Sequence, residues 1–321
     1  MRWFEWVAGP APRRRTAVLL GVLVTFLWAT SVVLIRLGLT EEEPNPIGFA
    51  GVRFALAAIL LVPLAWPSLR AARVWSASPR SLLSVAVYGL LMFCIAQVGF
   101  YVALGELTAS TVGLLMGLTP IVTALLVTRS HHERASRLQI VGIAILVIGV
   151  VAFFGLQIPS GDAALALLAG ISIPIVVGAS ARLGRYLAVD ARRLYGGALG
   201  LTAMAMLAGG FTTLMLALIL EGIPTFSPRA WLLIIWLAAV NTALAYTLWT
   251  QSQRSLRAVE SSVLGDLTVI QIALLGWIVL GEALDLGQWI GLLLALSGVV
   301  VVQLAPSLGR RDRRTESTSP M

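Results

Sequence analysis

The segment LTPIVTALLVTRSHHERASRLQIVGIAILVIGVV at residues 118–151 returns 149 residues later as LTVIQIALLGWIVLGEALDLGQWIGLLLALSGVV at residues 267–300. The gapless alignment extends back to cover 107–151 and 256–300, and about a third of its positions are identical. Apolar identities are common in any hydrophobic chain, but polar residues and glycines also match in the same register. These matches are Glu133 with Glu282, Gln139 with Gln288, Gly142 with Gly291 and Gly149 with Gly298. The chain therefore contains an internal repeat.

Along the whole chain, charged residues are confined to short segments between long apolar stretches. Hydrophobic residues make up 58% and charged residues 12%, with a mean hydropathy of +0.91, whereas soluble domains carry about 25% charged residues. A transmembrane helix needs about 20 mostly apolar residues to cross about 30 Å of hydrocarbon. Ten stretches meet that requirement, at approximately 16–38, 46–66, 82–104, 107–128, 137–156, 162–182, 196–220, 229–250, 258–280 and 286–305. The sequence thus predicts an all-α integral membrane protein with ten transmembrane helices.

The basic residues of this chain, all of them arginine, gather on one side of the predicted membrane. If the N-terminus is cytoplasmic and the ten spans alternate, every arginine except Arg36, Arg53 and Arg229 falls in or beside a cytoplasmic segment. The opposite loops carry acidic residues instead. Because cytoplasmic loops are enriched in basic residues, we predict a multi-pass protein of the cell membrane with both termini cytoplasmic. The net charge of +8 follows from this loop orientation and does not indicate binding of nucleic acid.

Each copy of the repeat contains five spans, so the second copy must cross the membrane in the opposite orientation. Glu133 then lies in the arginine-rich loop after the fourth span, and its mate Glu282 lies in the acidic loop after the ninth. Inverted repeats of this kind are typical of secondary transporters, whose substrate site lies between the halves near the bilayer midplane. The predicted organisation is a cytoplasmic segment at 1–15, five-helix repeats at 16–156 and 162–305, and a disordered cytoplasmic tail at 306–321.

Several short motifs resemble the EamA-like branch of the ten-helix drug/metabolite transporter superfamily. They are Leu27-Trp28-Ala29-Thr30-Ser31, Gly51-Val52-Arg53-Phe54, Leu118-Thr119-Pro120 and Gly281-Glu282-Ala283-Leu284, followed by Gln288 and Gly291. The resemblance covers nearly the whole chain. It implies a basket of two EamA-like repeats around a central cavity, carrying small metabolites such as amino acids, sugars or drugs, often outward.

Two features depart from the family pattern. The sixth span reads Ile171-Ser172-Ile173-Pro174 where the family often places a Ser-Trp pair, and the ninth span has Val269 where the fourth has Pro120. The ninth span also contains Asp266. Because of these differences, no substrate preference is transferred from the family.

Two charged residues inside spans are the sharpest candidates for substrate binding, because polar groups in hydrocarbon are costly and face a protein interior or a wet cavity. Asp266 in the ninth span could bind a cation or take up a proton in a coupling cycle; the alternative is a structural pair with Arg254 or Arg257. Arg53 in the second span could hold a carboxylate or phosphate with its bidentate fork. It could equally be structural, paired with Asp266 or bonded to free carbonyls.

Neutral polar and aromatic residues within the spans complete the predicted substrate site. Gln97 and Tyr101 stand four residues apart on the third span and share a face. The eighth span, its repeat partner, carries Asn241, Tyr246 and Trp249. Such groups could line a cavity that orients a small molecule, or they could form hydrogen bonds between helices. The remaining candidates near mid-depth are Trp28, Ser31, Thr119, Thr268 and Gln271.

Enzyme and pump functions find no support in the sequence. The only histidines, His131 and His132, do not form a helical metal motif, and no second aspartate within a span completes a protease dyad with Asp266. A nucleophile elbow is lacking, and so is a phosphate-binding loop, which would require a lysine. We therefore expect no catalytic residues, no metal and no cofactor.

Two functions follow from these observations. The first is a secondary transporter that exports a small metabolite, amino acid or drug-like solute by alternating access. The alternative is a translocase for lipids or lipid-linked groups with the same inverted-repeat fold. The expected partners are a small-molecule solute and the lipid bilayer, and the protein is expected to be a monomer or a homodimer.

Overall fold

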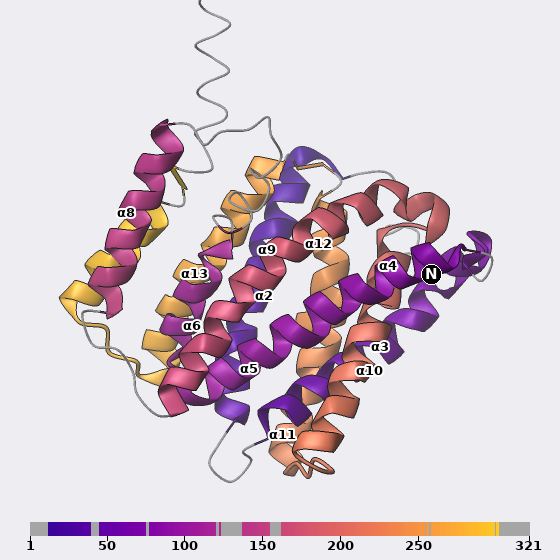
Figure 1. Cartoon of the computed structure of the whole chain (residues 1–321), viewed down its shortest axis with the longest axis horizontal. Helices are drawn as coiled ribbons and strands as arrows, with labels where there is room; N and C mark the ends of the chain where they lie inside the picture. Colours follow the sequence, from indigo (N-terminus) through magenta and orange to yellow (C-terminus); the bar gives the residue numbers. More distant parts are fainter. Residues whose placement is uncertain are drawn as a thin grey trace, which may run out of the picture.

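The protein is a helical bundle in the ranges that the computed structural model describes, which are 12–39, 45–74, 77–119, 122, 137–154, 162–253, 255–256, 258–298 and 300–301. Every regular element in these ranges is a helix (Figure 1). The predicted tail at 306–321 and most of the predicted N-terminal segment lie outside the described residues.

The helices follow one another as the hydropathy pattern predicts. In chain order they are α2 (Arg14–Gly38), α3 (Pro46–Ala71), α4 (Pro79–Leu90), η2 (Leu91–Ile95), α5 (Ala96–Glu106), α6 (Ala109–Met116), α8 (Arg137–Phe154), α9 (Asp162–Leu194), α10 (Ala198–Leu220), α11 (Pro228–Trp236), η3 (Leu237–Leu244), α12 (Ala245–Gln253) and α13 (Ala258–Leu280). The final helix is a shorter apolar helix, Leu286–Gly298. The elements α4, η2 and α5 form one continuous span, as do α11, η3 and α12, so the described chain contains part or all of each of the ten predicted spans.

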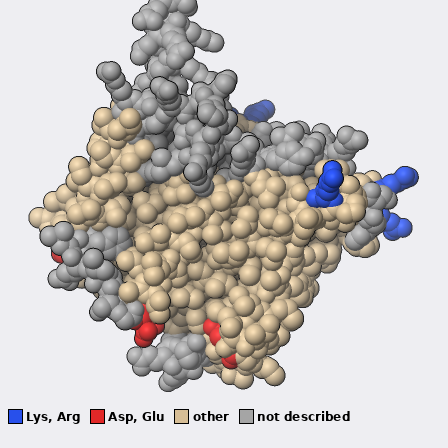
Figure 2. All heavy atoms as spheres, viewed as in Figure 1, with Lys and Arg blue, Asp and Glu red and all other residues tan. Residues whose placement is uncertain are grey.

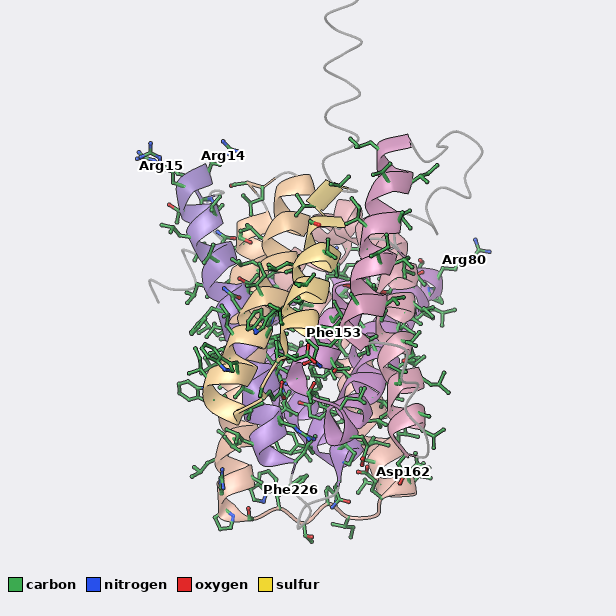
Figure 3. The ribbon with its side chains drawn as sticks, turned by 90° about the vertical axis from the view of Figure 1, so that its left-hand side faces the viewer. Arg14, Arg15, Arg80, Phe153, Asp162 and Phe226 are labelled. Atoms are coloured by element: carbon green, nitrogen blue, oxygen red, sulfur yellow. The ribbon has the colours of Figure 1, made fainter. Side chains whose placement is uncertain are left out.

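The surface of the bundle is apolar around its middle and charged at its two ends. Five helical segments of the described chain are long and apolar enough to cross a membrane, and four shorter apolar helices accompany them. Large apolar side chains such as Leu19, Ile219 and Leu232 are exposed on the outside, as expected for contact with lipid. Figure 3 shows Arg14, Arg15 and Arg80 at one end, called the arginine end, and Asp162 at the opposite, acidic end. The wide uncharged band between them (Figure 2) is that of a membrane-spanning protein.

Spans three and eight repeat the same unusual backbone, which extends the sequence repeat towards the N-terminus of each half. Each begins with Ser-Pro-Arg, at 78–80 and at 227–229. The serine hydroxyl of each accepts a hydrogen bond of 3.2 Å from the main-chain N–H three residues later, a typical N-cap. Each span then passes through a π-helical segment, η2 or η3, about midway along its length. Such segments interrupt the regular α-helical hydrogen bonds and are often found at functional sites.

The contacts between α8 and the final helix reveal the symmetry of the two halves (Figure 1). At Gly149, an added methyl group would lie 2.3 Å from the main-chain nitrogen of Ala295 and 2.7 Å from the oxygen of Gly291. At Gly298, it would lie 2.5 Å from the nitrogen of Leu146 and 2.6 Å from the oxygen of Gly142. Adding 149 to the residue numbers of α8, or subtracting 149 from those of the final helix, converts one set of contacts into the other. The two helices therefore cross on a pseudo-twofold axis, as inverted repeats require.

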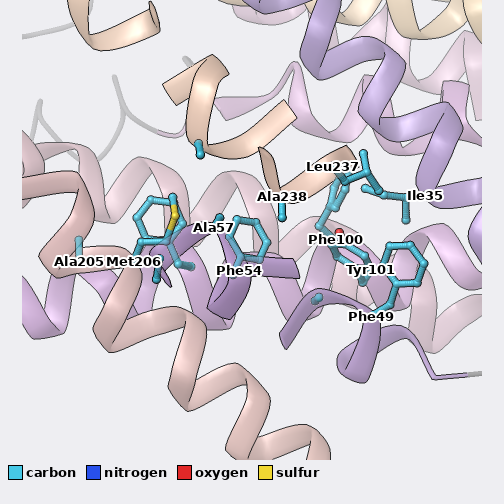
Figure 4. Packing of buried hydrophobic residues seen from close by; sticks show 14 of the residues in the cluster. Ile35, Phe49, Phe54, Ala57, Phe100, Tyr101, Ala205, Met206, Leu237 and Ala238 are labelled. Carbon is cyan, nitrogen blue, oxygen red and sulfur yellow. The ribbon is translucent and has the colours of Figure 1, made fainter. Parts of the chain in front are cut away.

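The two halves interlock rather than stand side by side. The principal helix pairs, α3 with α10, α5 with α9 and α2 with α13, each join the first half to the second. Gly51 packs against the backbone of Leu214, and Gly210 packs against Phe54, so α3 and α10 approach closely. Figure 4 shows buried side chains from both halves in the cluster that results, among them Phe54 and Tyr101 from the first half and Met206 and Leu237 from the second. A site at the centre of this bundle is necessarily made by both halves.

At the acidic end, two carboxylates from the second half cap helices of the first half. Glu221 accepts hydrogen bonds from the main-chain N–H groups of Ile47 (3.1 Å) and Gly48 (2.7 Å), at the start of α3. Glu282 accepts from the N–H groups of Ala109 (2.7 Å) and Ser110 (3.1 Å), at the start of α6. A helix N-terminus has unsatisfied N–H donors and attracts negative charge. These two carboxylates therefore fasten the halves together at this end.

Candidate functional site

A buried arginine lies at the junction of the two halves. The side chain of Arg53, in α3, is only 4% exposed. Its Nε donates a hydrogen bond to the hydroxyl of Thr242 in η3 (2.9 Å), and its NH1 donates to the hydroxyl of Tyr101 in α5 (2.8 Å). The guanidinium carbon also lies 5.2 Å from the centre of the Phe54 ring. Arg53 is thus held by neutral groups from both halves.

The positive charge of Arg53 is not balanced by any carboxylate among the side chains that the structure describes. A guanidinium has five N–H donors, and two of them are used by Tyr101 and Thr242. A charged residue inside a membrane helix costs up to about 3 kcal/mol on insertion scales, and such residues mark binding sites and ion pathways. The spare donors and the unbalanced charge make Arg53 suited to binding an anionic group.

Next to Thr242, the side chain of Asn241 connects η3 to α2. Its Nδ2 donates to the main-chain oxygen of Leu27 and to the hydroxyl of Thr30 (3.1 Å). Its Oδ1 is buried and has no hydrogen-bond partner within the described part of the chain. The same holds for Thr268 Oγ1 and Gln271 Oε1, both on α13. Because a buried polar atom without a partner is costly, these atoms are candidates for binding a ligand.

The packing of α2 against α13 brings Gln271 to the level of Trp28. The two helices run in the same direction, and a methyl group added to Gly21 would lie 2.7 Å from Leu264 Cδ1. Two helical turns are about seven residues. Trp28 and Gln271 each lie seven residues beyond this contact, so they stand at the same depth on the facing sides of the two helices.

A row of aromatic rings joins the surroundings of Arg53 to Trp28. The ring of Phe54 lies 5.8 Å from that of Phe93, which lies 5.5 Å from Tyr246. Tyr246 lies 5.4 Å from Trp28, and Trp28 lies 5.0 Å from Trp249. These centroid distances are those of favourable aromatic pairs. The rings give the centre of the bundle an apolar wall between its polar groups.

Several of the residues predicted from the sequence thus lie together in the structure. Arg53 and Tyr101 are in direct contact, and Asn241, Trp28, Tyr246 and Trp249 lie nearby on α2, η3 and α12. Thr268 and Gln271 share one face of the neighbouring α13.

The four remaining predicted residues make contacts within their own helices, are buried in them, or have a side chain outside the described part of the structure. Gln97 Nε2 donates within its own span, to the main-chain oxygen of Met92 (3.3 Å), and Thr119 donates to that of Met116 (2.6 Å). Ser31 is a buried residue of α2. The backbone of Asp266 belongs to α13, but its side chain is outside the described part of the structure.

Thr242 and Phe54 are neighbours of Arg53 that were not predicted from the sequence. Phe54 directly follows Arg53, and its ring turns towards the guanidinium. Thr242 directly follows Asn241, but a regular helical pattern does not indicate that adjacent side chains bind different helices. Successive residues of a helix point in different directions, and in η3 Asn241 binds α2 while Thr242 binds α3.

Comparison with known proteins identifies the family. A model of the EamA-like transporter family matches residues 15–155 and again residues 164–304. The chain belongs to the EamA-like transporter family. This confirms the resemblance drawn from the short motifs, and the EamA-like chain is accordingly a membrane transporter with two repeats.

Two further similarities accord with membership of the EamA-like family. Over 68 residues, which are 21% of this chain and 87% of the relative, the chain is 38% identical to "Putative permease-like protein YdzE" of Bacillus subtilis (strain 168). A solved crystal structure of a protein matches 92% of this chain and 98% of its own length, with a TM-score of 0.61 and 19% identity. This second similarity concerns the fold alone.

Replacing Tyr101 with phenylalanine tests whether its hydroxyl supports the arginine of this EamA-like transporter. We expect the free energy of unfolding to fall by about 1.5–3 kcal/mol, the typical contribution of a hydrogen bond to a charged group. Thermal unfolding of purified protein in detergent would measure the change. Tyr88→Phe is the control, because no hydrogen bond of the Tyr88 hydroxyl is found within the described part of the chain. Equal losses in both variants would contradict the expected role of Tyr101.

Proposed function

We propose that this EamA-like transporter is a secondary carrier that exports a small metabolite, amino acid or drug-like solute by alternating access. The observation that carries the proposal is the buried Arg53, held between Tyr101 of the first half and Thr242 of the second. A site shared by two halves changes its exposure when the halves move relative to each other, which is the basis of alternating access. The pseudo-twofold crossing of α8 and the final helix supports an exchange between two conformations of similar energy.

In this mechanism the caps at the acidic end belong to one of the two conformations. Glu221 and Glu282 hold the starts of α3 and α6, so opening at the acidic end requires these hydrogen bonds to break. The π-helical segments η2 and η3 lie midway along their spans, where a local change in helical hydrogen bonding would let the two ends of each span move separately.

We propose further that the arginine end faces the cytoplasm and that the protein resides in the cell membrane. The enrichment of arginine at one end of the chain's spans supports this orientation. One chain supplies all the residues of the candidate site, so we propose that a single chain is the transporting unit, in a monomer or within a homodimer.

Counterflow in liposomes tests the proposed function. Purified protein is reconstituted into vesicles loaded in turn with each unlabelled solute of a panel of amino acids, sugars and drug-like amines and acids. A carrier is expected to draw the labelled form of its solute into the vesicles transiently, whereas a pore is not. Exchange of a labelled lipid between leaflets without any solute counterflow would favour the lipid translocase instead.

Asp266→Asn tests whether transport is coupled to protons. We expect the variant to retain counterflow of the solute at equal pH but to lose the acceleration caused by a pH gradient, because asparagine cannot bind and release a proton. Asp162→Asn, at the exposed start of α9, is the matched control and should behave like the wild type. If the pH dependence survives in Asp266→Asn, this residue is not the proton relay.

A further inference from the structure

We propose that the transported solute carries an anionic group, a carboxylate or a phosphate, which binds the guanidinium of Arg53, and an N–H or O–H donor, which binds the amide oxygens of Asn241 and Gln271. This inference rests on the proposed function and names the chemistry of its substrate. It makes Arg53 the residue that determines charge specificity.

The surroundings of Arg53 favour an anion over any other ligand. The side chain is almost fully buried, and the hydroxyls of Tyr101 and Thr242 accept two of its N–H donors. Both are neutral, so they orient the guanidinium without cancelling its charge. The remaining donors of a planar guanidinium match the spacing of two oxygens of one carboxylate or phosphate. A cationic solute would be repelled from the same position.

The buried amide oxygens supply the complementary half of the site. Asn241 Oδ1 and Gln271 Oε1 can only accept hydrogen bonds, and both lack a donor among the described residues. The Asn241 amide is fixed by its own two hydrogen bonds to α2, so its oxygen has a defined direction. A bound N–H or O–H group would satisfy these atoms. Because Asn241 and Thr242 are adjacent in η3, the acceptor of Asn241 and the cation of Arg53 flank the same segment of backbone.

The aromatic row determines what can join the two polar parts of the solute. Phe54, Phe93, Tyr246 and Trp28 lie in a chain of contacts from Arg53 to the level of Gln271. Rings of this kind stack well on flat apolar groups. We therefore infer a compact apolar body between the anionic group and the donor.

A matched series of probes tests the inference by binding, independently of transport. The probes are 3-phenylpropanoate, phenethyl phosphate, 3-phenylpropanamide and 3-phenylpropylamine, which share one apolar body and differ in charge. Binding to purified full-length protein in detergent is measured at constant ionic strength by calorimetry. We expect the carboxylate, the phosphate or both to bind, and the amide and amine to bind at least tenfold more weakly. Equal binding of all four, or binding of neither anion, would overturn the inference.

Variants of Arg53 then locate the site. Arg53→Gln is expected to weaken anion binding about 30-fold or more, the usual result of removing one partner of a buried charge pair. Arg53→Lys retains the charge without the planar fork and should keep the preference for anions at reduced affinity. Arg36→Gln is the matched control, since Arg36 donates to the main-chain oxygens of Leu104 and Gly105 (2.6 Å each) rather than to the Arg53 site. If Arg53→Gln does not fold, the wild-type series and Arg53→Lys still decide the question.

Asn241 is tested by a separate comparison. Adding a hydroxyl group at the far end of the ring of the carboxylate probe, as in 3-(4-hydroxyphenyl)propanoate, should strengthen binding to the wild type relative to 3-phenylpropanoate, and Asn241→Leu should remove that gain. An equal gain in both proteins would overturn the role of the amide oxygen.

Two further experiments complete the test. The first identifies the source of the anion, and the second separates a failure of this inference from a failure of the proposed function. In nanodiscs, displacement of bound 3-phenylpropanoate by phosphatidylglycerol but not by phosphatidylcholine would identify a lipid headgroup as the anion, and displacement only by soluble anions would identify a soluble solute. Anion binding that depends on Arg53 without counterflow would refute the carrier and retain the site. Counterflow of neutral or cationic solutes that ignores Arg53→Gln would retain the carrier and refute the site.

Discussion

Replacing Gly149 with alanine is expected to destabilise the protein by about 3 kcal/mol or more, at the upper end of overpacking effects. The new methyl group would lie 2.3 Å from the main-chain nitrogen of Ala295, and a backbone atom cannot rotate away as a side chain can. The final helix would have to move away from α8. Gly298 occupies the equivalent position in the second repeat, so Gly298→Ala should have an effect of similar size.

Thermal unfolding in detergent, together with the yield of monodisperse protein, would measure both variants. Gly105→Ala is the control, because an added methyl group at this helical position meets no atom within 4 Å. Alanine is favoured over glycine in a helix by about 1 kcal/mol, so this variant should be neutral or slightly more stable. If Gly149→Ala unfolds like Gly105→Ala, or if Gly149→Ala and Gly298→Ala differ widely, the symmetric crossing is not the close contact described.

The second large effect is expected from the double variant Glu221→Gln with Glu282→Gln. Each substitution removes the negative charge and one acceptor oxygen from a helix N-terminus of the opposite half. We expect a combined loss of about 2–4 kcal/mol, since hydrogen bonds to charged groups contribute about 1.5–3 kcal/mol and glutamine retains part of each cap. The two sites serve different helices and share no partner, so the single effects should add.

The double variant is measured by thermal unfolding in detergent at low and high salt. Glu106→Gln is the control, since this glutamate is exposed at the end of α5 and makes no hydrogen bond in the described structure. The control should change stability by less than about 0.5 kcal/mol, as is usual for surface substitutions. A single variant that costs as much as the pair would mean that the two caps act as one unit.

The membrane spans were predictable because the bilayer imposes a simple rule on sequence. A buried helix in lipid must be apolar over about 20 residues, so the stretches at 46–66 and 196–220 are visible as hydropathy alone. The structure confirms the all-helical membrane fold and the two repeats. The inversion of those repeats followed from the odd number of spans in each.

The candidate site was only partly predictable. Arg53 and Asn241 stand out because polar groups are rare inside spans, and that signal is independent of the fold. Thr242 carries no such signal, since threonine is common in membrane helices and its role depends on the packing of η3 against α3. The partnership of Glu282 with Ala109 joins residues 173 positions apart, and no local pattern indicates which helix end a loop carboxylate will cap.

The sequence by itself determined the ten apolar spans, the gathering of arginines on one side of them and the inverted repeat, because these follow from the cost of polar groups in lipid and from the parity of the spans. Only the tertiary structure decided which residues lie in contact. Arg53 contacts Tyr101 and Thr242, and Gly149 contacts the final helix. Those choices depend on how closely helices approach and how each is rotated. Both are set by packing among many residues at once and not by any one stretch of the chain.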